Sequence, residues 1–277
     1  MTVIATDPLL DQLIALNGLR FHYRDWPNEG AQTLLLLHGF TGHARSWDTL
    51  ARAMNDRYRV LALDQRGHGE SDWATEYSVE SMVSDVDAFV RALGLKQFAL
   101  LGLSMGGRNA YHYAAKHPAE VERLVIVDIG PEIPTAGSQR IRTGVEAADV
   151  FDTAEEALAR SRVANPLAPE AELRHRVLNN LMRLADGRCT FRYDKGLRDN
   201  SRPLPRPTPG EGWAAVKAVH CPTLLVRGAQ SDILAPETAR QMVAGIADCR
   251  LVEVPRAGHS IPLDNPTGLI EAVRTFL

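Results

Sequence analysis

The sequence has few cysteines and no long apolar segment. Its 277 residues contain three cysteines, Cys189, Cys221 and Cys249, without a CxxC spacing, so we expect free thiols in a reducing compartment rather than a disulfide framework. The longest purely aliphatic run, Leu34–Leu37, is far too short to span a bilayer. No basic region followed by a long apolar core opens the chain, so no secretory signal is expected. These absences predict a cytoplasmic protein with no membrane partner.

The sequence also lacks an excess of charge of one sign. Its formal net charge is −3 and its isoelectric point is about 6.3, which gives no electrostatic support for nucleic-acid binding. The phosphate-loop pattern GxxxxGK[ST], the dinucleotide pattern GxGxxG and the zinc pattern HExxH are all absent. We therefore expect no nucleic-acid partner, no metal and no organic cofactor. The sequence does not indicate an oligomeric state.

Short apolar runs alternate with amphipathic helical stretches along most of the chain. Several runs are apolar at nearly every position, which is typical of parallel strands buried on both faces. Because strands and helices alternate, the sequence predicts an α/β fold with a doubly wound, mostly parallel sheet. Asn17–Trp26 alternates in polarity and is expected to form an antiparallel edge. The predicted strands are Thr33–Phe40, Tyr58–Gln65, Gln97–Ser104, Val121–Gly130, Cys221–Ala229 and Cys249–Pro255.

The alternation stops in an inserted block, residues 131–212. This block predicts three helices and no buried strand, followed by a Pro/Gly-rich return linker over Ser201–Gly212. We therefore predict a core of residues 1–130 and 213–277 and a helical cap formed by residues 131–212. A helical block inserted between parallel strands would cover their carboxyl ends, where ligands bind in such sheets. The alternative is a surface elaboration that contacts no substrate.

Ser104 is the main candidate for chemistry. The segment GLSMG, Gly102–Gly106, fits the pattern G-x-S-x-G, with a predicted strand before it and a predicted helix after it. In such a nucleophile elbow, a strained turn exposes the serine at the sheet edge, and the glycines remove side chains that would collide as strand and helix approach. A glycine-rich turn can also cradle a phosphate, but the phosphate-binding patterns are absent here. We predict that Ser104 is a nucleophile.

A serine nucleophile needs a base, and the base needs an acid to orient it. In this type of site the chain order is serine, carboxylate, histidine. Asp232 follows the predicted strand Cys221–Ala229, and His259 follows the last predicted strand, so both are expected at the sheet edge that carries Ser104. Asp128 also follows a strand and is the alternative acid. We predict Asp232, because its strand directly precedes the strand that leads to His259.

The loop HGFTG, after the first central strand, is predicted to complete the site. Gly39 allows a sharp turn there, and the backbone N–H groups of Phe40 and Met105 are predicted to form the oxyanion hole. Gly39 and His43 are candidates for the wall of the substrate pocket. His38 is expected to support the loop rather than to contact substrate.

Five segments in this order resemble the α/β-hydrolase superfamily: HGFTGHARSW, LDQRGHGESD, GLSMGG, VRGAQSDILAPE and AGHSIPLDNP. The resemblance spans Leu13 to Leu277 and is weakest in the inserted block. It implies the same nucleophile, base, acid and oxyanion donors, and a structural turn in which Asp64 and Arg66 hold loops in place. Because Ser104 stands where haloalkane dehalogenases and most epoxide hydrolases of the fold have aspartate, it argues against both.

We therefore predict a serine hydrolase that cleaves carboxylic esters of small to medium acyl chain through an acyl-enzyme, with a small-molecule ester as its partner. The resemblance also admits C–C bond hydrolases, lactonases and cofactor-free perhydrolases or haloperoxidases with the same triad, and the fold hosts non-catalytic binding proteins. Arg140 and Arg142 could approach the pocket and select a carboxylate-bearing substrate, as a C–C hydrolase or lactonase would need. The alternative is that both are simply solvated.

Overall fold

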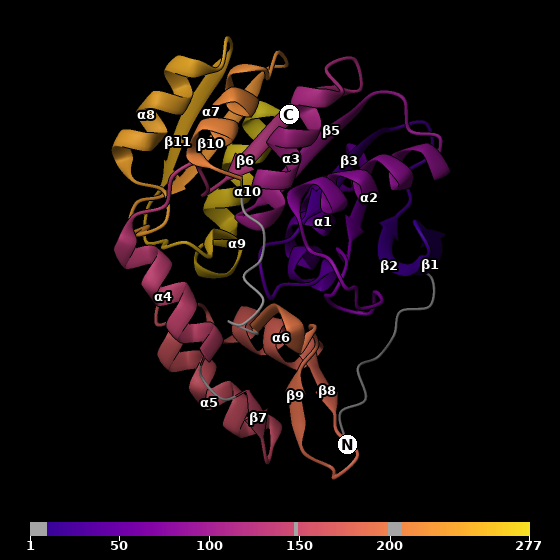
Figure 1. The fold of residues 1–277 in the computed structure, drawn as a ribbon, viewed down its shortest axis with the longest axis vertical. Helices are drawn as coiled ribbons and strands as arrows, with labels where there is room; N and C mark the ends of the chain where they lie inside the picture. The colour runs from indigo at the N-terminus through magenta and orange to yellow at the C-terminus, as the bar shows by residue number, and fades with distance from the viewer. Residues whose placement is uncertain (1–9, 147–148, 199–206) are drawn as a thin grey trace.

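The computed structural model describes residues 10–146, 149–198 and 207–277, and an eight-stranded sheet forms its centre (Figure 1). The two pairs that involve β2 are antiparallel and the remaining neighbours are parallel. This confirms the predicted α/β class with a doubly wound, mostly parallel sheet. In spatial order the strands are β1 (Asp11–Leu16), β2 (Leu19–Trp26), β4 (Tyr58–Leu63), β3 (Gln32–Leu37), β5 (Phe98–Leu103), β6 (Val121–Val127), β10 (Thr223–Gly228) and β11 (Cys249–Val254).

The antiparallel edge differs from the prediction by one strand. The segment Asn17–Trp26 contains β2, which is antiparallel as expected, but β1 lies outside it and forms the edge. The turn between them consists of Asn17 and Gly18, which both have positive φ angles of 51° and 76°. An Asn-Gly pair is a strong hairpin signal because it adopts this backbone conformation readily, so the preceding residues pair with β2 as an additional strand.

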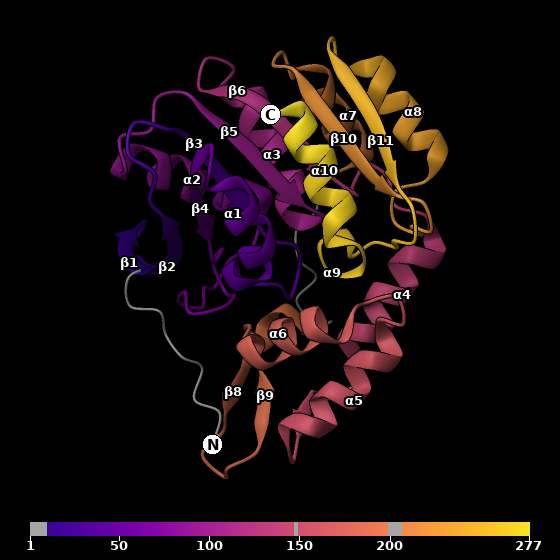
Figure 2. The same ribbon diagram turned by 180° about the vertical axis from the view of Figure 1, so that it is seen from behind.

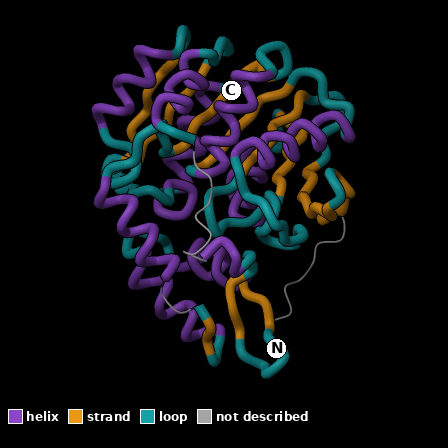
Figure 3. Tube along the Cα trace, viewed as in Figure 1, coloured by secondary structure: helices purple, strands orange, loops and turns teal. Residues whose placement is uncertain are grey.

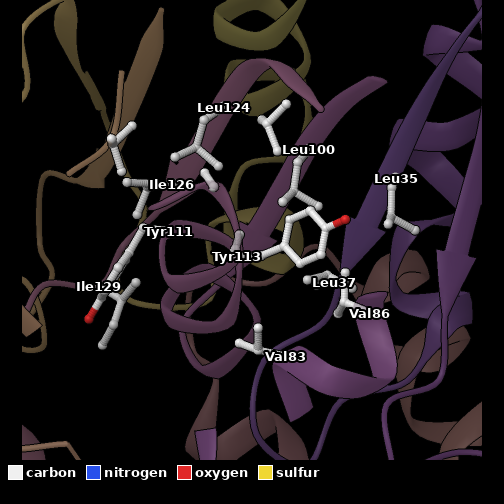
Figure 4. Packing of buried hydrophobic residues seen from close by; sticks show 14 of the residues in the cluster. Leu35, Leu37, Val83, Val86, Leu100, Tyr111, Tyr113, Leu124, Ile126 and Ile129 are labelled. Carbon is white, nitrogen blue, oxygen red and sulfur yellow. The ribbon is translucent and has the colours of Figure 1, made fainter. Parts of the chain in front are cut away.

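Alternate side chains of each central strand enter two separate cores. In β3, Leu35 and Leu37 belong to one core and Leu34 and Leu36 to the other, and all four are fully buried, as the two-residue period of a strand requires. Figure 4 shows the first core, where Leu35 and Leu37 lie near Val86 of a covering helix. Burial on both faces explains why these strands are nearly continuous apolar runs.

Helices cover both faces of the sheet (Figure 2). No helix in the described ranges has the length and apolar character that crossing a membrane requires. The first face is covered by α2 (Val79–Ala92), α3 (Met105–Lys116), α7 (Pro209–Lys217) and α8 (Pro236–Gly245). The second face is covered by the 3-10 helix η1 (Ala44–Trp47), α1 (Asp48–Met54), α9 (Ile261–Asp264) and α10 (Pro266–Phe276).

The inserted block lies beside one end of the sheet, and its apolar side chains form a small cluster that also includes Leu263 of α9 (Figures 1 and 3). It contains the three predicted helices and, in addition, a three-stranded sheet in the order β7-β9-β8 that the sequence did not suggest. Its elements are α4 (Thr135–Glu146), β7 (Val150–Phe151), α5 (Ala154–Ala164), α6 (Glu170–Asn180), β8 (Leu181–Arg183), β9 (Cys189–Phe191) and the 3-10 helix η2 (Lys195–Arg198).

The third predicted helix is shorter than expected because a hairpin takes over its last residues. Helix α6 ends at Asn180, and β8 pairs with β9 through a turn in which Gly187 has a φ angle of 88°. The Asp-Gly pair in LADG favours such a turn. The apolar residues Leu181 and Met182 continue the helical pattern in sequence, so periodicity alone cannot show where the helix stops.

The predicted return linker ends in a helix. Residues 199–206 lie outside the described part of the chain, but α7 begins at Pro209, and Thr208 caps it together with Glu211. A proline at the first helical position and a Thr-x-x-Glu capping box are helix-start signals. Val216 of this helix packs into the first core, so the segment from Pro209 belongs to the helical layer on the sheet.

Candidate functional site

Ser104 occupies a strained turn between β5 and α3. Its φ angle is 53° and its ψ angle is −116°, in a region that residues with a side chain rarely adopt. A Cβ at Gly102 would collide with the backbone of Gly106, and a Cβ at Gly106 would collide with the carbonyl of Leu37. The pattern G-x-S-x-G therefore has a steric cause, since strand and helix approach too closely for any side chain at either glycine.

Ser104, His259 and Asp128 form a continuous hydrogen-bonded chain. The Oγ of Ser104 lies 2.9 Å from Nε2 of His259, and Nδ1 of His259 lies 2.8 Å from Oδ2 of Asp128. Because the Asp128 carboxylate can only accept, Nδ1 carries the ring proton and Nε2 is free to accept from the serine. Asp128 is fully buried and also accepts from the Gly228 N–H at 2.9 Å and from Ser231 Oγ at 2.5 Å. These donors fix the carboxylate under the imidazole.

The prediction that Asp232 orients His259 is wrong. The Asp232 carboxylate is 38% exposed and binds the guanidinium of Arg140 in a two-pronged pair, at 2.6 and 2.8 Å. This pairing with Arg140 lowers the pKa of Asp232. The carboxylate that contacts His259 lies instead on the loop after β6, the strand next to β5, where Asp128 has a φ angle of 50°. The sequence offered both carboxylates, and only the three-dimensional contacts separate them.

The loop after β3 lies against the serine turn. A Cβ at Gly39 would be 3.3 Å from Cβ of Ser104, and the Gly39 carbonyl accepts from the Gly42 N–H at 2.9 Å. Thr41 has a positive φ angle of 60°, and its carbonyl accepts from Nδ2 of Asn180 in α6 at 3.0 Å. The inserted block therefore holds the backbone of this loop, a contact that no local sequence pattern indicates.

The predicted oxyanion donors are the backbone N–H groups of Phe40 and Met105. Phe40 lies in the loop just described, and among the described residues its N–H donates no backbone hydrogen bond. Met105 is the first residue of α3, and the first N–H groups of a helix have no acceptor within it. The positive end of the α3 dipole lies at the same place.

Buried polar residues support this loop, as expected. The Gln65 N–H donates to Nε2 of His38 at 3.0 Å, and Nδ1 of His38 lies 2.8 Å from the Gly39 carbonyl. Burial, together with the neighbouring His68, lowers the pKa of His38 to about 3, so the ring is neutral. Asp64 accepts from the backbone N–H groups of Ala44 at 2.5 Å and Glu70 at 2.9 Å, which confirms its role in holding loops.

Arg66 also holds loops in place, as the resemblance implied. Its guanidinium binds the buried carboxylate of Asp85 in α2 at 2.5 and 2.8 Å and donates to the Glu76 carbonyl at 3.0 Å. Neither Asp64 nor Arg66 lines the cavity beside Ser104.

His43 does not contribute to the pocket wall. It is buried at the start of η1, and its Nε2 lies 3.1 Å from the backbone carbonyl of Arg176 in α6. Burial lowers the pKa of His43 to about 4, so the ring is neutral and connects the core to the inserted block. Gly39, the other candidate, does line the cavity.

A cavity of about 360 Å³ lies between the core and the inserted block. Ser104 and His259 line it from the core, and residues of α4, α5, α6 and β9 line it from the inserted block. Its wall is mixed, with apolar side chains beside three arginines and one aspartate. The charged members are Arg140, Arg160, Arg176 and Asp149; Arg142 is not among the lining residues.

One group of metal-ligand types occurs among the described residues, at a different place. Asp87, His117 and Glu120 have ligand atoms within 4.8 Å of one another. Arg91 pairs with Asp87 at 2.9 Å, and the hydroxyl of Tyr113 donates to Glu120, so both carboxylates already have protein partners. None of the three residues lines the cavity.

The fold and the serine at the strand–helix turn define a class of hydrolases, and comparison with known proteins identifies the family. The family model described as "alpha/beta hydrolase fold" matches residues 32–266, so the chain belongs to the alpha/beta hydrolase fold family. A 3-hydroxybutyrate-oligomer hydrolase of Cupriavidus necator is 31% identical over 283 residues and aligns over 96% of each chain.

Two solved structures are similar over nearly the whole chain. The crystal structure of E-2-(acetamidomethylene)succinate hydrolase has a TM-score of 0.87 and 25% identity, covering 96% of this chain and 98% of that one. An esterase of Mycobacterium tuberculosis has a TM-score of 0.77 and 27% identity, covering 96% and 89%. These relatives are hydrolases; two of the three names specify a substrate, and those two substrates differ.

Proposed function

We propose that the protein is a serine hydrolase that cleaves carboxylic esters of small to medium acyl chain. The observation that carries this proposal is the hydrogen-bonded chain from Ser104 through His259 to Asp128, which opens into a cavity. A serine held by a correctly oriented imidazole is the arrangement that acyl transfer requires. Membership of this family does not determine which bond is cleaved, since one fold hosts many chemistries.

In the proposed mechanism, the Oγ of Ser104 attacks the ester carbonyl carbon while its proton passes to Nε2 of His259. The tetrahedral intermediate then breaks its bond to the alcohol oxygen, which takes that proton from Nε2. The acyl group stays on Ser104 as an ester. A water molecule repeats the two steps and releases the acid, with Nε2 first taking its proton and then returning one to Ser104. Asp128 keeps Nδ1 protonated throughout and stabilises the charged imidazole.

The oxyanion of the tetrahedral intermediate would be held by the N–H groups of Phe40 and Met105. Each such donor stabilises the transition state by about 3 kcal/mol. The start of α3 adds the positive end of its dipole at the same point. Asn180 would act on this step indirectly, because it holds the Thr41 carbonyl next to Phe40.

The inserted block is proposed to act as a cap. Leu173 and Val177 of α6 and Phe191 of β9 form part of the cavity wall opposite Ser104. A cavity of about 360 Å³ lies within the usual range for small-molecule sites and leaves little room for a long lipid chain. This is the support for a preference for short to medium acyl groups.

The test is kcat/KM across p-nitrophenyl esters with acyl chains of two to sixteen carbons, beside a lactone and a vinylogous diketone acid. We expect a maximum at short to medium length, and we expect Ser104→Ala to abolish both hydrolysis and labelling by a fluorophosphonate. If Ser104→Ala kept more than about a tenth of the wild-type kcat, Ser104 would not be the nucleophile. Activity on the lactone or the diketone acid alone would replace the esterase proposal.

A further inference from the structure

Arg176 places a guanidinium at the cavity, and no acidic side chain in the described part of the chain pairs with it. It lies on α6 and lines the same cavity as Ser104 and His259. Within the part of the chain that the structure describes, its guanidinium forms no hydrogen bond and no ion pair. Arginine side chains are rarely buried unless paired, so a partly buried arginine without a partner calls for an explanation.

The other charged groups of the cavity are already matched or solvated. Arg140 is held by Asp232 through two short contacts, and Asp149 pairs with Lys195 at 2.5 Å. Arg160 is exposed, and its guanidinium stacks over the ring of Phe151 at 5.0 Å. Neither Arg160 nor Arg176 donates a hydrogen bond to a protein group that the structure describes, but Arg160 is exposed to solvent whereas Arg176 is partly buried.

The surroundings of Arg176 are unfavourable for an unpaired charge. Burial lowers the pKa of Arg176, and the nearby charge of Asp264 opposes this effect. Asp264 does not bind the guanidinium; one of its oxygens accepts from the Gly258 N–H at 2.9 Å. A guanidinium remains charged in proteins, and a desolvated charge without a hydrogen-bond partner lowers stability. An anionic ligand would remove this penalty.

The position of Arg176 on α6 directs it toward bound substrate. Leu173, Val177 and Asn180 line the cavity from the same helix, at the three- and four-residue spacing of one helical face. Asn180 is buried, and its Oδ1 has no hydrogen-bond partner among the described residues. The α6 face thus presents an apolar wall, an arginine fork and one amide acceptor.

We propose that the substrate carries a carboxylate in addition to the ester, and that Arg176 binds this carboxylate. The inference rests on the proposed ester hydrolysis at Ser104 and specifies its substrate class. A single guanidinium fork matches the two oxygens of a carboxylate, whereas a phosphate group normally recruits several donors. Arg176 is thus a specificity-determining residue of the cavity.

Half-esters and neutral esters of equal length test this proposal directly. Monoethyl succinate, glutarate and adipate are compared with ethyl butanoate, pentanoate and hexanoate, and ethanol release is followed by a coupled dehydrogenase assay. We expect a higher kcat/KM for the half-ester of at least one pair. Arg176→Met should lower the half-ester to neutral-ester ratio for that pair by about ten- to a hundredfold, the effect of losing a charge-assisted hydrogen bond. Arg176→Lys, which keeps the charge and loses the fork, should lie in between.

Arg174→Met is the matched control. Arg174 lies on the same helix, but its guanidinium pairs with Glu155 and Glu170 at the surface, and it does not line the cavity. This variant should leave the ratio unchanged. An equal fall in Arg174→Met and Arg176→Met, or a wild-type enzyme that prefers the neutral ester in every pair, would overturn the proposal.

Melting temperatures, measured with and without glutarate, distinguish a specificity role of Arg176 from a structural one. Because no described protein group pairs with the charge of Arg176, Arg176→Met should melt at the same temperature as the wild type or higher. A clear fall in the melting temperature would show that Arg176 supports the fold instead. The glutarate dianion should raise the melting temperature of the wild type and of Ser104→Ala, but not that of Arg176→Met. Glutarate stabilisation that persists in Arg176→Met would overturn the assignment.

The two proposals fail in different ways. If neither ester type is hydrolysed but glutarate stabilises the wild type through Arg176, ester hydrolysis is wrong and the carboxylate site stands. If neutral esters are hydrolysed while half-esters are not and glutarate has no effect, ester hydrolysis stands and the carboxylate site is wrong.

Discussion

Asp128→Asn should remove most of the activity, and the hydrogen bonds around Asp128 give the reason. Oδ1 of Asp128 accepts from the Gly228 N–H, while Oδ2 accepts from His259 Nδ1 and Ser231 Oγ. In the asparagine variant the amide oxygen is needed by Gly228, so the NH₂ group faces His259. Nδ1 must then accept, the ring proton moves to Nε2, and the imidazole can no longer take the proton of Ser104.

The expected loss in kcat is about 10⁴-fold, the effect of the wrong imidazole tautomer in such a triad. It corresponds to about 5 kcal/mol of transition-state stabilisation. Asp232→Asn is the matched control, because it makes the same chemical change at an exposed carboxylate whose partner is Arg140. An exposed ion pair contributes little, so this variant should lose no more than about threefold in kcat.

The assay is the saturating rate on p-nitrophenyl butyrate, with circular dichroism and melting curves to show that both variants fold. Near-normal activity in Asp128→Asn together with collapse in Asp232→Asn would refute the assignment of Asp128. A large loss in both variants would show that Asp232 acts on catalysis through Arg140 and α4, and that the argument from exposure is wrong.

Three further predictions concern stability and positioning. Although burial favours the neutral ring, two carboxylate partners raise the pKa of His22 to about 9. The stability that the protonated His22 contributes is complete below about pH 6.5 and is lost as the pH rises through 9. His22→Gln should therefore reduce the free energy of unfolding by about 3 kcal/mol at pH 6 and by far less at pH 10, measured in denaturant titrations. An equal reduction at both pH values would contradict this. Gly106→Ala should destabilise by about 3 kcal/mol or more, since its Cβ would meet the Leu37 carbonyl; an unchanged melting temperature would disprove the steric argument. Asn180→Ala should lower kcat on p-nitrophenyl butyrate about tenfold, because the Thr41 carbonyl loses its donor and the adjacent loop shifts; a lower melting temperature with unchanged kcat would show that the contact is structural only.

Local patterns in the sequence predicted much of the core. The strands around β3 and β5 are apolar because both faces are buried, and Gly102 and Gly106 are required by a close backbone approach at one turn. These signals lie within a few residues of the feature they predict. The edge strand β1 and the start of α7 also have local signals in the sequence, namely an Asn-Gly pair and a Thr-x-x-Glu capping box with proline at the first helical position.

The choice of acid could not be made from the sequence. Asp128 and Asp232 both follow strands of the sheet, and each is a plausible partner for a histidine on a later loop. Asp128 is oriented by Gly228 and Ser231, about a hundred residues away in sequence, while α4 of the inserted block supplies Arg140 to Asp232. Which carboxylate turns toward His259 depends on these distant donors.

The sequence by itself determined the class of fold, the serine turn and the histidine, because each depends on residues that are neighbours along the chain or on a repeated strand period. Only the tertiary structure decided that Asp128 completes the hydrogen-bonded chain, that His43 is a buried connection to α6 and that Arg176 lines the cavity without a protein partner in the described part of the chain. The physical reason is that a side chain's partner, burial and charge state depend on groups brought together from remote parts of the chain, and no local pattern contains that information.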